Sequence, residues 1–181
     1  MRKGYVWKNK AGWCALQFTD KGVARFEFGF GSRAEAESRF CADVERIKIS
    51  ARLPEKIKEA VTQIDGYFEG RLKRFDVALD FGVATEFQKK VWRAAMKVLY
   101  GKTASYADIA AAAGCPGGAR AAGNALGANP VPVIVPCHRV LKSGGGLGGF
   151  SIGLDVKRAL LALERGETAD FAAARFIRND G

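Results

Sequence analysis

The sequence contains a single histidine among its 181 residues, and its four cysteines lie far apart with no C-x-x-C pair. Structural zinc sites are built from clusters of cysteine and histidine, so we expect no metal here. The chain also lacks an apolar run close to the roughly 20 residues that a membrane span needs, and its first residues carry no apolar segment of a signal peptide. We therefore expect a soluble cytoplasmic protein with reduced thiols.

Acidic side chains are scarce in the middle of the chain. Residues 87–158 hold ten Lys or Arg against two acids, Asp108 and Asp155, so this segment carries +8 of the net charge of +10. Such an excess on one segment is typical of a surface that binds phosphates. The alternative is a solvated basic face without a partner.

Hydrophobic periodicity divides the chain into two parts. Residues 5–30 alternate apolar and polar side chains around TDKG, which predicts a β-hairpin, and residues 71–81 alternate again, which predicts a third strand. The segments 32–47 and 54–70 have helical spacing, and the pattern after the GVAT stretch is helical almost to the end. We predict an α+β protein, with a small α/β domain at 1–82 and an all-α, winged-helix-like domain at 83–181.

Residues 105–130 have the pattern of a helix-turn-helix, with a capping box at Ser105, a CPGG turn and a second helix over 120–126. From 109 to 138 the only charged residue is Arg120, and the second helix offers small residues where a sequence-reading helix presents polar ones. This composition favours close approach to a narrow groove without sequence preference, with Arg120 as a single probe. The alternatives are two helices that pack without DNA and an Arg120 in an ordinary surface salt bridge.

The stretch VPVIVPCHRVL, residues 131–141, places Cys137 next to the only histidine, His138. A cysteine attacks as the thiolate, so it needs a lowered pKa or a base such as histidine. We expect an extended stretch whose neighbouring side chains point to opposite faces, with a water bridging thiol and ring. In the last helix Lys157 and Glu164 share one face, either as a surface stripe or with the Glu buried against His138.

The loop SGGGLGGFSIG, residues 143–153, fits the G-x-G-x-x-G pattern of a dinucleotide site. That site needs a following strand whose acid binds the ribose, and the chain shows no such strand pattern. We interpret the loop as a flexible wall of a pocket beside Cys137.

The stretch NPVPVIVPCHRV resembles, almost residue for residue, the active-site motif of the O6-alkylguanine-DNA alkyltransferases. The resemblance extends from FQKKVW through GFSIGLDVKRALLALE, and is looser before it, mainly at QIDGYFEGRLKRFDV. It implies a direct-reversal DNA repair protein that binds duplex DNA through the minor groove and flips out O6-alkylguanine. The alkyl group would pass irreversibly to the protein's own cysteine in a single turnover, without a cofactor. We expect a monomer, with cooperative binding along DNA left open.

The same resemblance assigns roles to individual residues. Cys137 would accept the alkyl group, His138 would act as base through a water, and Glu164 would orient His138. Asn129 would brace the turn, and Tyr106 would turn the phosphate and donate to the leaving guanine. Lys157, Ser151, Phe150 and the Val140 backbone would line the base pocket. The DNA contacts would come from Tyr106, Arg120, Ala119, Ala121, Gly123 and Asn124, with Arg120 filling the gap that the flipped base leaves.

Two departures and three alternatives accompany this resemblance. Phe150 stands where tyrosine is common and Ile152 where glycine is common, and a bulkier loop argues against a broad tolerance of large alkyl groups. Related lesion-binding proteins lack the acceptor cysteine, so Cys137 favours transfer over binding alone. A helix-turn-helix regulator is disfavoured because base-reading side chains are missing. A Cys-His hydrolase is disfavoured because its dyad residues are usually distant in sequence.

Overall fold

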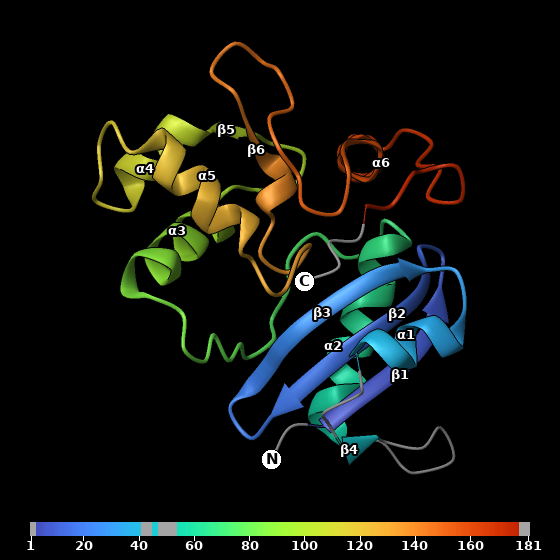
Figure 1. Cartoon of the computed structure of the whole chain (residues 1–181). Helices are drawn as coiled ribbons and strands as arrows, with labels where there is room; N and C mark the ends of the chain where they lie inside the picture. The colour runs from blue at the N-terminus through green and yellow to red at the C-terminus, as the bar shows by residue number, and fades with distance from the viewer. Residues whose placement is uncertain (1–2, 41–44, 47–53, 178–181) are drawn as a thin grey trace. The chain divides into compact units, whose positions relative to one another are not determined.

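The computed structural model describes residues 3–40, 45–46 and 54–177, and the chain divides into two compact units, Met1–Gly82 and Val83–Gly181. The first unit is a small sheet with helices and the second is largely helical, so the predicted α+β class is confirmed (Figure 1). Within the described residues, no helix has both the length and the apolar content to cross a membrane.

The first unit is a sheet in the order β3-β2-β1-β4, with helices on both faces. Strands β1 (Lys3–Asn9), β2 (Gly12–Thr19) and β3 (Gly22–Phe30) form an antiparallel meander, and β4 (Glu45–Arg46) pairs parallel to β1. Helix α1 (Arg33–Phe40) buries Ala36 and Phe40 against Val6 on one face. Helix α2 (Glu55–Phe68) packs Phe68 against the aromatic rings of β3 on the other (Figure 1).

The third strand is not where the sequence pattern places it. Residues 71–81 form only an isolated bridge between Leu79 and Val23, and the third strand of the meander is β1. The chain turns between β1 and β2 because the Asn9 carboxamide accepts a hydrogen bond from the backbone N–H of Ala11 at 2.8 Å, a local turn that strand periodicity does not reveal. The helix expected over 32–47 ends at Phe40, and residues 41–44 and 47 lie outside the described part.

The second unit packs α3 (Glu86–Met96), α4 (Tyr106–Ala112) and α5 (Ala119–Gly127) around a small apolar core. Capping boxes at Thr85 and Ser105 begin α3 and α4, and the indole N–H of Trp92 donates to the Ala125 carbonyl at 2.8 Å. The predicted helix-turn-helix is therefore present as α4 and α5. Helix α6 (Leu154–Glu164) contacts the short 3-10 turn η1 (Cys137–Arg139).

One element of this unit is not helical. Strands β5 (Ala104–Ser105) and β6 (Val140–Leu141) pair in parallel, with Ala104 opposite Val140. Tyr106 follows β5 directly and η1 directly precedes β6, so this short ladder brings the start of α4 beside the turn that carries Cys137.

Candidate active site

Cys137 lies in a tight turn rather than on the extended strand that the sequence suggested. Its backbone N–H donates to the Val135 carbonyl at 2.8 Å, and it is the first residue of η1. The Asn129 amide donates to the same carbonyl at 2.9 Å and to Cys137 Sγ at 3.1 Å. Prolines on either side of the apolar run shape this turn, and Val133 has a φ of 75°, an uncommon value for a β-branched residue. Asn129 thus holds both the turn and the sulfur, as the resemblance implied.

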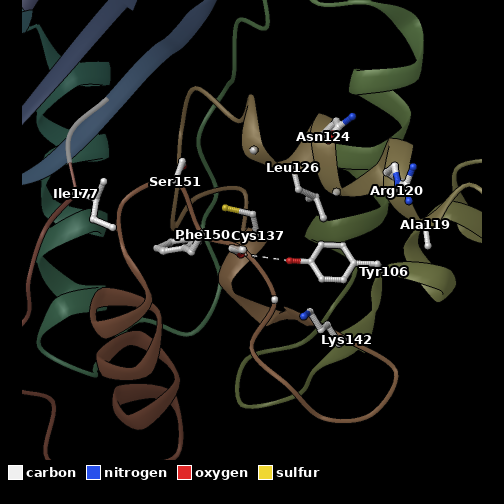
Figure 2. Close-up of a pocket in the computed structure, with 14 residues that line it drawn as sticks. Tyr106, Ala119, Arg120, Asn124, Leu126, Cys137, Lys142, Phe150, Ser151 and Ile177 are labelled. Atoms are coloured by element: carbon white, nitrogen blue, oxygen red, sulfur yellow. Dashed lines mark hydrogen bonds between the residues drawn. The ribbon is translucent and has the colours of Figure 1, made fainter. Parts of the chain in front are cut away.

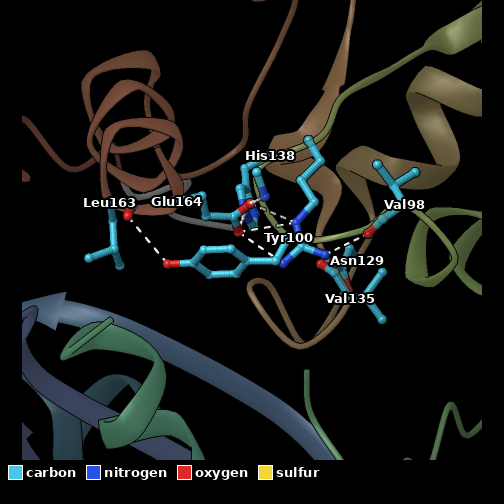
Figure 3. Close-up of polar contacts among 9 residues, drawn as sticks. Val98, Tyr100, Asn129, Val135, His138, Leu163 and Glu164 are labelled. Carbon is cyan, nitrogen blue, oxygen red and sulfur yellow. Dashed lines mark hydrogen bonds and ion pairs between the residues drawn. The ribbon is translucent and has the colours of Figure 1, made fainter. Parts of the chain in front are cut away.

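Behind the thiol, His138 and Glu164 form a buried pair (Figure 3). His138 is fully buried, and its Nε2 lies 2.7 Å from Glu164 Oε1. The backbone N–H of Gly101 donates to Glu164 Oε2 at 2.9 Å. Lys157 and Glu164 do share one side of α6, but both are buried, so the interpretation as a surface stripe is wrong.

Arg139 belongs to the same cluster, and the sequence reasoning missed it. Its guanidinium donates to both oxygens of Glu164, at 2.9–3.0 Å, and to the Val98 carbonyl at 2.7 Å. A bidentate guanidinium on a buried carboxylate fixes the position of that carboxylate more firmly than His138 alone could. Its place next to His138 was a hint that it belongs to the site, but the sequence does not show which acid it meets.

Electrostatics set the resting charge of each group in this cluster. Burial alone would raise the pKa of Glu164, but hydrogen bonds from His138 and Arg139 outweigh it and lower that pKa to about 2. Burial lowers the pKa of His138 despite Glu164, so the ring is neutral at neutral pH. Because an ionised carboxylate only accepts hydrogen bonds, Nε2 donates to Glu164 and Nδ1 is the ring atom that can take up a proton.

The thiol itself is protonated at rest. Burial raises the pKa of Cys137, against the hydrogen bond from Asn129 and the charge of Lys157, which lower it. Burial also lowers the pKa of Lys157 to about 8. The site therefore needs a base at the moment of reaction rather than a thiolate that is formed beforehand.

A cavity of about 740 Å³ opens in front of Cys137 (Figure 2). Its walls come from the start of α4, the exposed side of α5 and the glycine-rich loop, and its volume suits a purine base and its sugar. The residues predicted from the resemblance that line it are Tyr106, Ala119, Arg120, Gly123, Asn124, Cys137, Phe150 and Ser151. Gly148 and Gly149 also line the cavity and belong to the loop expected as its wall, and the lining residues that were not predicted are Leu126, Gly127, Lys142 and Ile177.

Three of the residues predicted to contact the base or the DNA do not line the cavity. Ala121 is exposed on α5 and does not line the cavity. Lys157 is fully buried and donates through Nζ to the carbonyls of Val140 and Leu147, at 2.6 and 2.5 Å. Lys157 therefore holds the glycine-rich loop in place through the Leu147 carbonyl. Val140 contributes to the site through its backbone carbonyl, which accepts from Lys157.

The glycine-rich loop is a wall of this cavity, as we expected, and no strand follows it to form a dinucleotide site among the described residues. Gly148 has a φ of 69°, and an added Cβ would lie 2.7 Å from the Tyr106 side chain. Glycine at this position lets the Tyr106 hydroxyl reach the Gly149 carbonyl, to which it donates at 3.2 Å. Across the described residues no group of three His, Cys, Asp or Glu side chains could hold a metal ion.

A helix-turn-helix lies beside a cavity that can hold a purine base. A cysteine thiol lines this cavity, and the next residue is a buried histidine that can take up a proton. These features define a DNA-binding protein with a nucleophilic cysteine. The family model for the DNA-binding domain of 6-O-methylguanine DNA methyltransferase matches residues 86–166. The chain belongs to the family of methylated-DNA–protein-cysteine methyltransferases, which are DNA-binding enzymes of DNA repair.

Relatives and solved structures agree with this assignment. The methylated-DNA–protein-cysteine methyltransferase of Mycolicibacterium paratuberculosis is 50% identical over 112 residues, 62% of this chain and 67% of the relative. That of Methanosarcina barkeri is 44% identical over 128 residues, 69% of this chain and 80% of the relative. The crystal structure of Mycobacterium tuberculosis OGT in complex with DNA is 36% identical, with a TM-score of 0.77 over 93% of this chain and 96% of that one.

Proposed function

We propose that the chain binds duplex DNA through the minor groove, turns an O6-alkylguanine into the cavity and transfers the alkyl group irreversibly to Cys137. The observation that carries this proposal is the position of Cys137: it lines a cavity that can hold a purine base with its sugar, and the next residue, His138, is buried in a pair with Glu164. A protein that binds the lesion without transfer would need neither the Cys137 thiol nor His138 as a proton acceptor.

Helix α5 supplies the DNA-binding face. Its exposed residues are small, apart from Arg120 and Asn124, so the helix can lie close to a groove and its phosphates. The basic segment 87–158 adds attraction for the phosphate backbone without reading the sequence. Arg120 stands exposed at the edge of the cavity. It fills the space that the base leaves and so slows the return of the base.

The base must leave the stack because the O6 substituent sits on its pairing edge, where no protein thiol can line up behind it. Extrusion costs a few kcal/mol, and less for a damaged and poorly paired base. Phe150 and Ser151 from the glycine-rich loop then enclose the base opposite Tyr106, and the loop keeps its position because Lys157 holds it. The Val140 carbonyl lies beside the bound base and accepts a hydrogen bond from Lys157.

The chemical step forms one bond and breaks one. His138 takes the proton of Cys137 through a water, Sγ attacks the alkyl carbon, and the bond from that carbon to O6 breaks. Guanine leaves as a neutral base because it gains a proton from Tyr106 or Lys157. Burial raises the pKa of Tyr106, so its hydroxyl keeps the proton that it must donate. Glu164 keeps His138 oriented and stabilises the charge that the ring acquires.

The product is a thioether, which has no good leaving group and cannot be hydrolysed back to the thiol. Each molecule therefore reacts once. The test is the mass of the protein and its peptides after incubation with a duplex that contains one O6-methylguanine. We expect one added methyl on the Cys137 peptide and restored guanine in the DNA, whereas an unmodified protein that binds the lesion would refute the transfer.

Two variants separate binding from transfer in the same assay. Cys137→Ser should bind the duplex and transfer nothing. Arg120→Ala should lose repair of duplex DNA more than its reaction with free O6-benzylguanine, because the free base needs no flipping. Equal losses with both substrates would show that Arg120 has no part in flipping.

A further inference from the structure

The C-terminal segment contributes one wall of the active-site cavity. Ile177 lines the cavity, although it lies 40 residues beyond Cys137 in the chain. Its backbone N–H donates to the Ile152 carbonyl in the glycine-rich loop at 2.8 Å. The neighbouring Gly153 has a φ of 115°, and an added Cβ would lie 2.6 Å from the Arg175 carbonyl. The C-terminal segment thus packs closely against the glycine-rich loop at two successive loop positions, 152 and 153.

Ile177 lies at the end of the cavity away from the DNA-binding helix. Figure 2 shows Arg120 and Ala119 on one side of Cys137, and Ser151 and Ile177 on the other, with Phe150 between. A base that comes from DNA on α5 enters from the side of Arg120. The far side of the thiol is then walled by Phe150, Ser151 and Ile177.

The geometry of displacement decides which walls beside the thiol the alkyl group meets. The sulfur, the alkyl carbon and O6 lie nearly in line when the bond transfers. The other substituents of the carbon therefore project sideways from this line. For a methyl group they are hydrogens, which need little space. For a benzyl group one of them is an aromatic ring, which has to fit against the walls beside the thiol.

We propose that Ile177 is a specificity-determining residue that closes the alkyl end of the cavity and limits the size of the O6 substituent transferred to Cys137. This inference rests on the proposed function. Ile177 is 51% exposed and lines the cavity, so its side chain contacts both solvent and that end of the cavity. A smaller side chain opens the cavity outward, and a larger one fills it, without change to the thiol or to His138.

The experiment compares two duplexes that differ only in the lesion, O6-methylguanine or O6-benzylguanine, in single-turnover reactions of the full chain. The readout is the ratio of the benzyl to the methyl rate. Ile177→Ala should raise this ratio about tenfold and Ile177→Phe should lower it about tenfold, the scale for one or two carbons in a hydrophobic pocket. Arg175→Ala is the matched control, because Arg175 is exposed on the same segment, does not line the cavity and should leave the ratio unchanged.

The opposite changes in the rate ratio of the two variants distinguish a limit on the size of the alkyl group from mere support of the loop. If the segment merely stabilised the loop, both variants would slow both substrates alike and the ratio would stay constant, which would overturn the inference. A wild-type protein that transfers neither group would overturn the proposed function, and the role of Ile177 with it. Transfer of both groups with an unchanged ratio in both variants would overturn the role of Ile177 alone.

Discussion

At the scale of single residues, the carboxylate of Glu164 holds two partners in place at once. It accepts hydrogen bonds from His138 and from the guanidinium of Arg139, and all three side chains are buried. A buried carboxylate with such partners is costly to neutralise, because the partner that remains charged is left in a region without water. The same residue therefore bears on stability and on the base that the reaction needs.

Glu164→Gln should destabilise the protein and slow transfer together. Loss of one partner of a buried ion pair typically costs about 3–5 kcal/mol, here through the uncompensated charge of Arg139. Unfolding in urea and the single-turnover rate measure the two effects. Glu167→Gln is the control, because Glu167 pairs with Arg165 at the surface and should change neither quantity. A variant at Glu164 as stable as wild type would contradict the role of the buried pair.

The pH dependence of stability follows from the same residue. The pKa of Glu164 is lowered from 4.5 to about 2 in the folded state. A lowered carboxyl pKa contributes stability that is present above the unfolded value and is lost as pH falls through the folded one. The free energy of unfolding should thus fall as pH drops from about 4.5 to about 2. Glu164→Gln should flatten this part of the curve, and an unchanged slope would assign it to other carboxylates.

The rate should also depend on pH on the alkaline side. Burial lowers the pKa of Lys157 to about 8, so this side chain loses its charge above that value, whereas it is cationic below it. If cationic Lys157 assists the leaving guanine, transfer from free O6-benzylguanine should slow as pH rises beyond about 8. Stopped reactions across pH 6–9.5 measure the profile. A rate that rises over the whole pH range, as for an ordinary free thiol, would contradict this role of cationic Lys157.

At the scale of elements, the capping box of α4 links local stability to the site. The Ser105 hydroxyl accepts from the Asp108 N–H at 3.1 Å, and Tyr106 is the first residue of the helix. Ser105→Ala should cost about 1 kcal/mol and also slow transfer, because the helix start that positions Tyr106 frays. Thr85→Ala removes the equivalent cap of α3 at a similar cost and should leave transfer unchanged. Equal transfer rates in the two variants would show that the Ser105 cap does not position Tyr106 for the reaction.

Local chemistry explains which elements could be predicted from the sequence. The cap at Ser105, and the helix it begins, depend on residues three or four positions apart. The third strand was misplaced because the turn after Asn9 is made by a side chain, which the alternation of residues 5–30 hides. The expected strand at Cys137 is a turn because Asn129 and the prolines bend it.

The site was predictable only where a motif carried it. Cys137, His138 and the wall formed by the glycine-rich loop came from adjacent residues and a resemblance. Arg139 escaped because nothing in the sequence shows which acid it meets, and that acid lies 25 residues away on α6. Ile177 escaped because its contact with Ile152 is a backbone hydrogen bond, which leaves no trace in side-chain chemistry.

At the scale of the whole molecule, one transfer event should change the stability of the protein that carries it. Cys137 is 6% exposed, and its sulfur accepts a hydrogen bond from Asn129 at 3.1 Å. An added methyl replaces the thiol proton and weakens that contact, at a cost on the order of 1 kcal/mol. Melting curves of the methylated and unmodified protein should therefore differ, with the methylated form lower. Coincident curves would show that the cavity absorbs the methyl without strain.

The single histidine gives this molecule a built-in spectroscopic reporter. Every imidazole signal in a nitrogen-15 NMR spectrum of the chain comes from His138, which is buried against Glu164. At rest the spectrum should contain one protonated and one unprotonated ring nitrogen, and the second nitrogen should take up its proton at a lower pH than in an exposed histidine, because burial lowers the pKa of the ring. The same two signals, followed after alkylation, would record where the thiol proton goes without any engineered label.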